Sequence, residues 1–307
     1  MSQFRKGLSD EFLRQLAEEA NKGSWWTDVL NDYKLFIGIR DNHLNVYWHG
    51  QSLFSVRPGL KVSTHIKFLV DPKLKEQVQL VGGKFELSAL EVCGFIGEYK
   101  DSETLNKMKT AASLFAGREK KGCHEVILSN PNVIDREIAF PGILSPNDGD
   151  PDGRPGQVDL LSLEPEDGTA RLVFWEAKHF TNGELRALGP DVAVCKQIAR
   201  YRKYLREHRD EIEACYKRVV NNLVALDKMR RGLNPGFKPL PSLISEVIEG
   251  RPLTLGTEPK VGLVIFGFDK AQRDHPDWRS HLQRLEEDVE VARVVAAGNP
   301  KNIQLKL

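Results

Sequence analysis

The sequence contains no long hydrophobic run, few cysteines, and no repeated or low-complexity segment. Without about 18 consecutive apolar residues it offers no candidate for a membrane-spanning helix, and its polar beginning lacks the apolar centre of a signal peptide. The four cysteines form no CxxC pair, which excludes the usual structural zinc motifs and, in a reducing compartment, argues against disulfides. We therefore expect a cytoplasmic protein whose cysteines are buried apolar residues.

Length and composition indicate a soluble globular protein with one large or two ordinary domains. The chain has 307 residues, of which 40% are hydrophobic and 28% charged. The formal net charge of +1 does not identify a partner, because acidic residues elsewhere can mask a local basic surface. A change of pattern near residue 101 predicts two domains, 1–100 and 101–307.

Residues 1–100 begin with a helical pattern and continue as short strands. An apolar helical face follows a cap at Ser9 or Asp10, and Asp41-Asn42 separates two strand-like runs as a hairpin turn would. No spacing here indicates chemistry, so we interpret the adjacent Trp25 and Trp26 as core residues. We predict a smaller α+β amino-terminal domain of unknown role, for which recognition of a target or partner is one hypothesis.

From about residue 102 the pattern predicts a helix, three strands, a second helix and a final strand. The first helix is expected to break or kink near Gly117 and Gly122. The strand candidates are VIDREIAF, QVDLLSLE and ARLVFWEAK, and the turn-forming run 165–168 joins the last two as an antiparallel hairpin. A basic helical region follows from about 192 to 232, in one or two pieces, and KVGLVIFGFD has the length and apolar content of a buried strand.

The strand candidate at residues 170–180 is apolar on both faces until Glu176 and Lys178. Residues two apart share a face of a strand, so these two side chains lie on the same side. In a buried strand an unpaired Glu or Lys would cost several kcal/mol, so both need a partner. Asp159 lies on the neighbouring strand of the predicted hairpin. Two carboxylates together with the Ala177 carbonyl would hold a hard divalent cation such as Mg²⁺.

Asp159 followed by Glu176-Ala177-Lys178, in this order of elements, resembles the PD-(D/E)xK nuclease superfamily. Gln197 and Tyr201 have the QxxxY spacing of its RecB-like branch, and four residues apart they share one helical face. The resemblance covers residues 102–270, with one departure, since no proline precedes Asp159. It implies an α/β, restriction-endonuclease-like core with a mixed sheet flanked by helices, and cleavage of phosphodiester bonds with Mg²⁺ or Mn²⁺.

The resemblance also implies a role for each residue of the motif. Asp159 and Glu176 would hold the metal ion. Lys178 would orient the attacking water and balance charge on the phosphate rather than act as a base, because two carboxylates favour its protonated form. Gln197 and Tyr201 would position the backbone or the metal-bound water from the helix side.

The helix before the three strands is expected to supply one further residue. Glu125 resembles the helical glutamate common in the superfamily, and His124 resembles the metal-binding histidine of the RecB-like branch. Adjacent helical residues point about 100° apart, so only one of them can face the site, and we predict Glu125. Helix packing is the alternative for His124. Glu137, on the first strand, is a weaker candidate for which an ion pair or solvent exposure is the alternative.

The basic helical region gives the prediction about the substrate. From residue 194 to 232 it has eleven Lys and Arg residues against five Asp and Glu, an excess of six positive charges. Such a surface would follow a phosphate backbone, and a solvated helix face is the alternative. The residues predicted to contact nucleic acid are Lys196, Arg200, Arg202, Lys203 and Arg206. The sequence does not decide between DNA and RNA; DNA is preferred because the resembled family mostly cuts DNA.

Two other functions fit parts of the sequence. The run from Asp148 to Asp159 has the spacing of a calcium-binding EF-hand loop, but strand-like segments flank it where that motif needs helices. The second alternative is a nuclease fold that binds or assembles without catalysis, and the buried charges of the motif argue against it. We expect a DNA nuclease of restriction, phage defence or repair. It would have no membrane partner. A homodimer, and a partner protein bound through residues 1–100, are the two hypotheses for its assembly.

Overall fold

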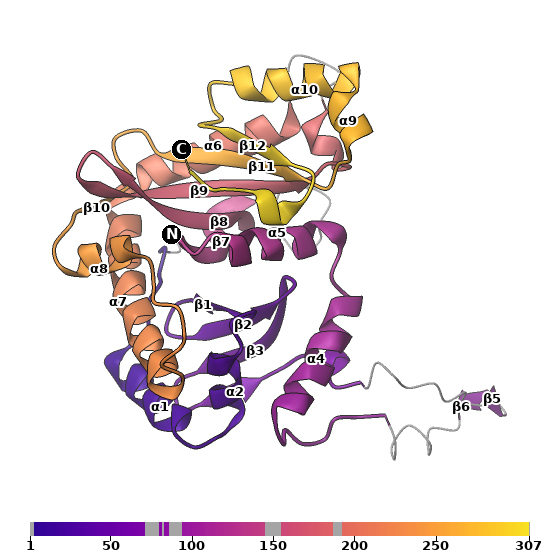
Figure 1. Ribbon diagram of the computed structural model, residues 1–307, viewed down its shortest axis with the longest axis vertical. Helices are drawn as coiled ribbons and strands as arrows, with labels where there is room; N and C mark the ends of the chain where they lie inside the picture. The colour runs from indigo at the N-terminus through magenta and orange to yellow at the C-terminus, as the bar shows by residue number, and fades with distance from the viewer. Residues whose placement is uncertain are drawn as a thin grey trace.

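The computed structural model describes residues 3–70, 80–81, 83–85, 94–144, 155–186 and 192–306. It is an α/β structure in which helices flank a mixed sheet, and the amino-terminal part of the chain adds a separate antiparallel sheet (Figure 1). Within these ranges, none of the helices combines the length and the apolar character needed to cross a membrane.

The amino-terminal sheet has four antiparallel strands in the order β1-β2-β3-β4. Of the two predicted caps Ser9 is confirmed, because its side chain accepts the N–H of Phe12, whereas Asp10 is the first residue of the helix. The predicted hairpin turn is confirmed as well, with Asn42 at a φ of 46° between β1 and β2. Trp26 is fully buried, as expected of a core residue. The elements of this part are α1 (Asp10–Ala20), α2 (Trp25–Asn31), β1 (Phe36–Ile39), β2 (Leu44–Trp48), β3 (Gln51–Arg57), β4 (Lys61–Ser63), η1 (Ile66–Phe68), β5 (Leu80–Val81) and β6 (Lys84–Phe85).

The long helical region after residue 101 is two helices, α4 (Ser102–Leu114) and α5 (Arg118–Ser129). The predicted break is confirmed at Gly117, whereas Gly122 lies inside α5. A Cβ atom at Gly122 would lie 2.1 Å from Cε2 of Phe266, which is closer than any real contact. Glycine is therefore needed there because it lets α5 approach the mixed sheet, and it does not bend the helix.

The mixed sheet has the strand order β12-β11-β9-β8-β7, with β10 paired to β9. β7, β8 and β9 are antiparallel neighbours, whereas β9, β11 and β12 run parallel. Asp167 and Gly168 both have positive φ in the turn between β8 and β9, which confirms the predicted hairpin. The strands are β7 (Val133–Leu144), β8 (Pro155–Glu166), β9 (Thr169–His179), β10 (Leu253–Thr254), β11 (Lys260–Phe266) and β12 (Val294–Ala297).

Helices cover both faces of this sheet. Val126 and Ile127 of α5 pack in one apolar cluster with Trp175 of β9, whereas Ile198 of α6 packs with Phe174, on the other side of the same strand. The predicted basic helical region is two helices, α6 and α7, which meet at His208. The remaining elements are η2 (Gly183–Leu185), α6 (Ala193–Glu207), α7 (Arg209–Leu233), α8 (Ser242–Ile248), α9 (Lys270–Asp274), α10 (Pro276–Glu287) and η3 (Pro300–Asn302).

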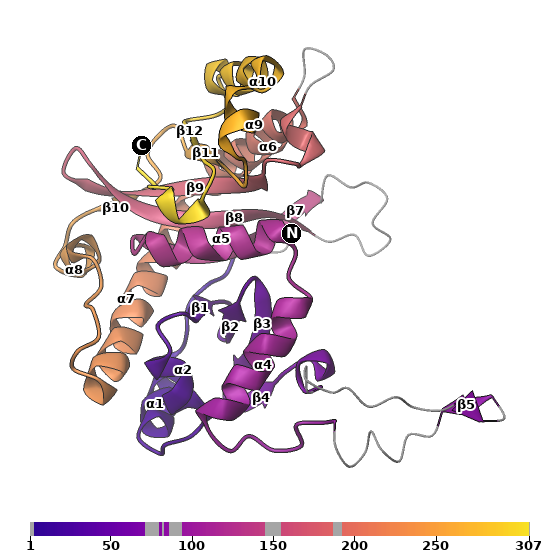
Figure 2. The same ribbon diagram turned by 45° about the vertical axis from the view of Figure 1, so that its right-hand side comes forward.

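The amino-terminal sheet and the mixed sheet share one buried apolar cluster. It includes Phe12 of α1 and Leu44 of β2 together with Phe174 of β9 and Tyr216 of α7. In both views α5 runs between the two sheets, and α7 extends from the mixed sheet along α1 and α2 (Figure 2). α4, which follows the predicted boundary at residue 101, packs against η1 and β3, which precede it. The division into 1–100 and 101–307 stays a prediction.

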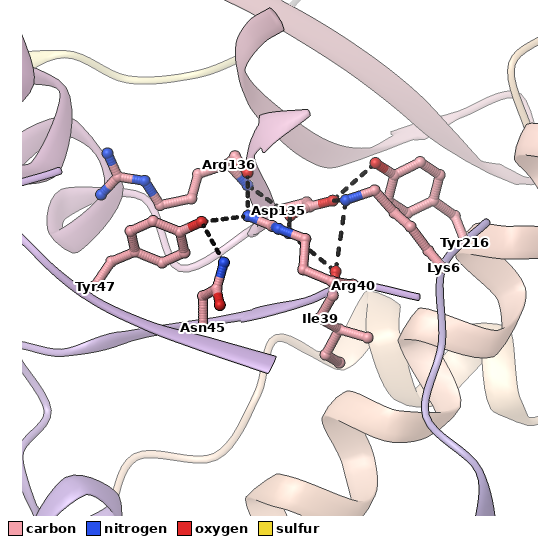
Figure 3. Close-up of polar contacts among 8 residues, drawn as sticks. All are labelled: Lys6, Ile39, Arg40, Asn45, Tyr47, Asp135, Arg136 and Tyr216. Atoms are coloured by element: carbon pink, nitrogen blue, oxygen red, sulfur yellow. Dashed lines mark hydrogen bonds and ion pairs between the residues drawn. The ribbon is translucent and has the colours of Figure 1, made fainter. Parts of the chain in front are cut away.

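A buried ionic network also joins the two parts of the chain (Figure 3). Asp135 of β7 is fully buried, and its carboxylate lies 2.5 Å from Nζ of Lys6 and 2.7 Å from Nη1 of Arg40. The hydroxyl of Tyr216 donates to the same carboxylate at 2.9 Å. Burial alone would raise the pKa of Asp135, but Lys6 and Arg40 hold it below its usual value. The carboxylate therefore stays ionised, and it links two amino-terminal cations to β7 and α7.

Three of the four cysteines, Cys123, Cys195 and Cys215, are buried and free. For these three the expectation of unpaired, buried thiols is confirmed. Cys93 lies outside the described residues.

Candidate active site

The backbone ladder between β8 and β9 runs from Glu166 and Thr169 to Leu160 and Trp175. Just beyond its end, the side chain of Asp159 continues the connection, because its Oδ2 accepts the N–H of Ala177 at 2.8 Å. Asp159 is thus fixed beside the end of β9, at the place where the two strands cease to pair.

Glu176 and Lys178 lie two residues apart near the end of β9 and are only 2% and 6% exposed. Nζ of Lys178 lies 2.8 Å from Oε1 of Glu176 and 2.6 Å from Oε2 of Glu184, which belongs to η2. The ammonium group therefore lies between two carboxylates. This arrangement supplies the partners that two buried charges on an apolar strand require.

Burial and mutual repulsion change the proton affinities of the site. Burial raises the pKa of Glu176 well above its usual value, and the charge of Asp159 raises it further. Burial also raises the pKa of Asp159 to about 6, although Lys178 and the Ala177 N–H oppose the change. For Lys178 burial alone would lower the pKa, but Glu176 and Asp159 raise it above the usual value. Lys178 therefore keeps its proton. The two carboxyl groups repel each other when both are ionised, so a proton or a cation between them is favourable.

Gln197 and Tyr201 close the site from α6. Nε2 of Gln197 donates to the Tyr201 hydroxyl at 2.7 Å, and that hydroxyl donates to the carbonyl oxygen of Gln157 at 2.6 Å. Burial, together with the charges of Glu176 and Asp159, raises the pKa of Tyr201, so its hydroxyl remains a neutral donor. The QxxxY pair therefore holds the backbone of β8 two residues before Asp159.

Three oxygen atoms of this cluster are buried without a hydrogen-bond partner: Oε2 of Glu176, Oε1 of Gln197 and Oε2 of Glu184. The last of these lies in an ion pair with Lys178, whereas the first two are left for a cation. A buried acceptor without a donor costs about 1–3 kcal/mol, and a cation would remove that cost. Carboxylate and amide oxygens are the donors that Mg²⁺ and Mn²⁺ prefer, so these groups fit such an ion. Across the described ranges no three His, Cys, Asp or Glu side chains are grouped to hold a metal. Further ligands would therefore be carbonyl oxygens, water or substrate phosphate, as is usual for Mg²⁺.

The structure adds a carboxylate from the first helix that the sequence analysis did not select. Glu119, in the first turn of α5, accepts the N–H of His179 and a side-chain N–H of Asn182, both at 3.0 Å. Its charge contributes to the raised pKa of Asp159. A sequence signal for it exists, because Glu119 precedes Cys123 and Val126, which pack on the sheet, by four and seven residues on one helical face.

The structure does not bring Glu125 or His124 to the site, which corrects the prediction for the first helix. Oε2 of Glu125 lies 3.5 Å from Nζ of Lys301. Nε2 of His124 lies 2.9 Å from the Lys34 carbonyl oxygen, and its Nδ1 lies 3.4 Å from Nη1 of Arg136. Burial and Arg136 lower the pKa of His124 to about 3, so the ring is neutral and packs between the helix and the amino-terminal sheet. Both residues lie more than one turn beyond Glu119 on α5.

The weaker candidate Glu137 lies close enough to Asp159 to contribute to the raised pKa of that carboxyl. Its backbone has a φ of 48°, a left-handed conformation that is uncommon for a residue with a side chain. Oε1 of Glu137 also lies 3.4 Å from Nη2 of Arg136. Glu137 therefore forms the ion pair that was expected as an alternative, and it also lies near Asp159.

The five predicted nucleic-acid contacts on α6 fall into two groups. Lys196, Arg200 and Lys203 are exposed and follow one another at helical spacing on one face. Arg202 instead donates to the carbonyl oxygens of Pro259 and Val289 and to the carboxylate of Glu290. Arg206 pairs with Glu258 at 2.9 Å. Arg202 and Arg206 therefore contact distant segments, and phosphate binding by the five residues stays a prediction.

Most of the alternative calcium loop, residues 148–154, lies outside the described residues. The segments that flank it, β7 and β8, are strands. An EF-hand requires helices at both positions, so the flanks argue against this alternative.

Comparison of the chain with protein-family models, with curated proteins and with solved structures finds no match. Any assignment of function therefore depends on the geometry of the site itself.

Proposed function

We propose that the chain is a metal-dependent nuclease of the PD-(D/E)xK type that hydrolyses phosphodiester bonds, with DNA as the substrate and Mg²⁺ or Mn²⁺ as the cofactor. The observation that carries this proposal is the meeting of Asp159, Glu176 and Lys178 at the point where β8 and β9 cease to pair. The unpartnered Oε2 of Glu176 supports a cation at this place.

Asp159 and Glu176, with the Ala177 carbonyl, are the residues that would hold the ion. When bound, the ion would polarise the scissile phosphate and lower the pKa of a water molecule. The ammonium of Lys178 faces Glu176 and Glu184 with two of its three donors. The third remains for a phosphate oxygen or the attacking water. Because Lys178 stays protonated, its contribution is to stabilise negative charge that develops on the phosphate.

Gln197 and Tyr201 act through the position of β8. Their hydrogen bonds end on the carbonyl oxygen of Gln157, so they fix the backbone that presents Asp159. We therefore assign them as positioning residues. Glu119 fixes the end of β9 in a similar way through the N–H of His179.

The test is cleavage of linear, circular, single-stranded and double-stranded DNA by the purified chain with Mg²⁺, Mn²⁺ or EDTA. Lys178→Ala should lower the cleavage rate by on the order of 10² or more while DNA affinity changes little, because remote basic residues dominate binding. Excess Mn²⁺ should restore part of the activity of Glu176→Ala but none of that of Lys178→Ala, since a metal cannot replace an ammonium group.

A matched control is Lys107→Ala, because the Lys107 side chain is 46% exposed and pairs with Glu103 on its own helix. This variant should cleave like the wild type. Cleavage that survives in both site variants would show that the activity lies elsewhere. A wild-type chain that retains DNA but never cuts it, with either metal, would support the non-catalytic binding module instead.

A further inference from the structure

Glu184 is a carboxylate of the site to which neither the sequence nor the proposed chemistry gives a role. Its side chain is 31% exposed, against 8% for Lys178 and 3% for Glu176. Oε2 of Glu184 nevertheless lies 2.6 Å from Nζ of Lys178, slightly closer than Oε1 of Glu176 at 2.8 Å. A partly exposed carboxylate therefore supplies a close counter-charge to a buried ammonium group.

The chain after β9 is fixed so that Glu184 turns back onto this lysine. The side-chain oxygen of Asn182 caps η2 and accepts the N–H of Glu184 at 3.0 Å. Nδ2 of Asn182 donates to Oε2 of Glu119 at 3.0 Å, which ties the cap to α5. Leu185, the next residue of η2, is fully buried in the large apolar cluster. These contacts hold the backbone on both sides of Glu184, as outer contacts commonly orient the groups of a metal site.

The other carboxyl groups that act on Lys178 are both proposed metal ligands. Oε1 of Glu176 pairs with the ammonium, and the charge of Asp159 acts on it as well. The lysine side chain is flexible, so without Glu184 its ammonium would turn to these two residues alone. It would then neutralise the charge that a divalent cation needs. Glu184 gives the ammonium a counter-charge for which the cation does not compete.

We propose that Glu184 is a positioning residue, which holds the ammonium of Lys178 away from the metal-binding carboxylates and so keeps the site open to a divalent cation. The inference rests on the proposed nuclease function, because that function assigns Asp159 and Glu176 as the metal ligands. Glu184 acts through Lys178 and is not itself a ligand of the ion.

Mn²⁺ titration of the full chain, followed by electron paramagnetic resonance, tests this role with Glu184→Gln and Lys178→Met, alone and combined. Glu184→Gln alone should weaken Mn²⁺ binding by about tenfold or more, because the ammonium then competes with the ion. In the Lys178→Met background the same substitution should change the affinity by less than about threefold, since no ammonium remains to compete. Equal losses in both backgrounds would overturn the proposal, because a structural role or direct ligation would not depend on Lys178.

Glu103→Gln is the matched control, because the Glu103 side chain is 75% exposed on α4 and pairs with Lys107. It should bind Mn²⁺ like the wild type. Glu184→Asp is a second variant that keeps the charge, and it should bind Mn²⁺ more tightly than Glu184→Gln does.

The role of Glu184 and the nuclease function can fail separately. A wild-type chain that shows this dependence on Lys178 but never cuts DNA would overturn the nuclease function alone. DNA cleavage by the wild type, together with equal losses of Mn²⁺ affinity in both backgrounds, would overturn only the role of Glu184. A wild-type chain that binds no Mn²⁺ would overturn both.

Discussion

Asp159 and Glu176 hold their protons more tightly than exposed carboxyl groups do, because they are buried side by side. In the metal-free protein, the raised pKa of Asp159 makes stability decrease as the pH rises. The stabilisation by Asp159 is present below its ordinary pKa of 3.8 and is lost as the pH rises through about 6. A bound cation reverses this preference, since it requires the ionised carboxylates. Protons and metal therefore compete for the same oxygen atoms.

Metal affinity should consequently depend on pH. Mn²⁺ binding should weaken as the pH falls below about 6, where Asp159 becomes protonated, by about tenfold per pH unit for each proton displaced. Mn²⁺ titrations followed by electron paramagnetic resonance from about pH 5 to 8 would measure this dependence. Asp159→Asn should bind Mn²⁺ more weakly and with a shallower pH dependence. A wild-type affinity that is constant over this range would contradict metal binding at Asp159.

Asp135 is the residue whose substitution should most affect the stability of the buried ionic network. Asp135→Asn should destabilise the protein by about 3–5 kcal/mol, because it leaves Lys6 and Arg40 buried without a counter-charge. Urea unfolding followed by circular dichroism would give the change in free energy of unfolding. Asp210→Asn is the control, since the Asp210 side chain is 92% exposed, and it should change stability by no more than about 0.5 kcal/mol. Equal stabilities of the two variants would show that the network contributes little.

At the level of secondary-structure elements, the basic residues of α6 divide into an exposed face that is predicted to bind DNA and residues that contact other segments of the chain. If its exposed basic face contacts DNA phosphates, Arg200→Gln with Lys203→Gln should flatten the dependence of log affinity on log salt by about one to two units. Each lost contact removes about 0.9 on duplex DNA. DNA-binding titrations at several salt concentrations measure this slope, and an unchanged slope would mean that the face is only solvated.

Arg202→Gln provides the contrast on the same helix. Its guanidinium group bonds to Pro259, Val289 and Glu290, so its loss should lower thermal stability while leaving the salt slope nearly unchanged. A flattened slope with unaltered stability would assign Arg202 to DNA binding, as the sequence had suggested.

The secondary-structure elements could be predicted where the residues of a short segment determine its backbone conformation. Asp167 and Gly168 accept the positive φ that a tight hairpin needs, and the hairpin then makes Asp159 a neighbour of β9. Helical periodicity places Glu119 on the face of α5 that packs on the sheet, but its contact with His179 depends on how far α5 extends along the sheet, which periodicity does not specify. The partners of Arg202 lie between 56 and 88 residues further along the chain, so no local pattern reveals them.

In the described parts of the chain, one large apolar cluster contains residues from both the amino-terminal sheet and the mixed sheet. Residues 101–307 expressed alone should therefore fail to fold cooperatively, because they would expose the apolar surface that Phe12 and Leu44 cover and would leave Asp135 without Lys6 and Arg40. Thermal unfolding of this fragment, compared with the full chain, is the measurement. A sharp transition near the full-length midpoint would instead show that residues 101–307 fold independently of residues 1–100.

The network around Asp135 also bears on how this sequence can diverge. A change that removes the negative charge at Asp135 leaves two buried cations, and a change that removes Lys6 or Arg40 removes a counter-charge of the aspartate. Mutations at these positions are therefore expected to accumulate together, so that related chains keep all three charges or replace them jointly by uncharged residues. Covariation between positions 6, 40 and 135 would be the evolutionary record of a contact that joins the two sheets.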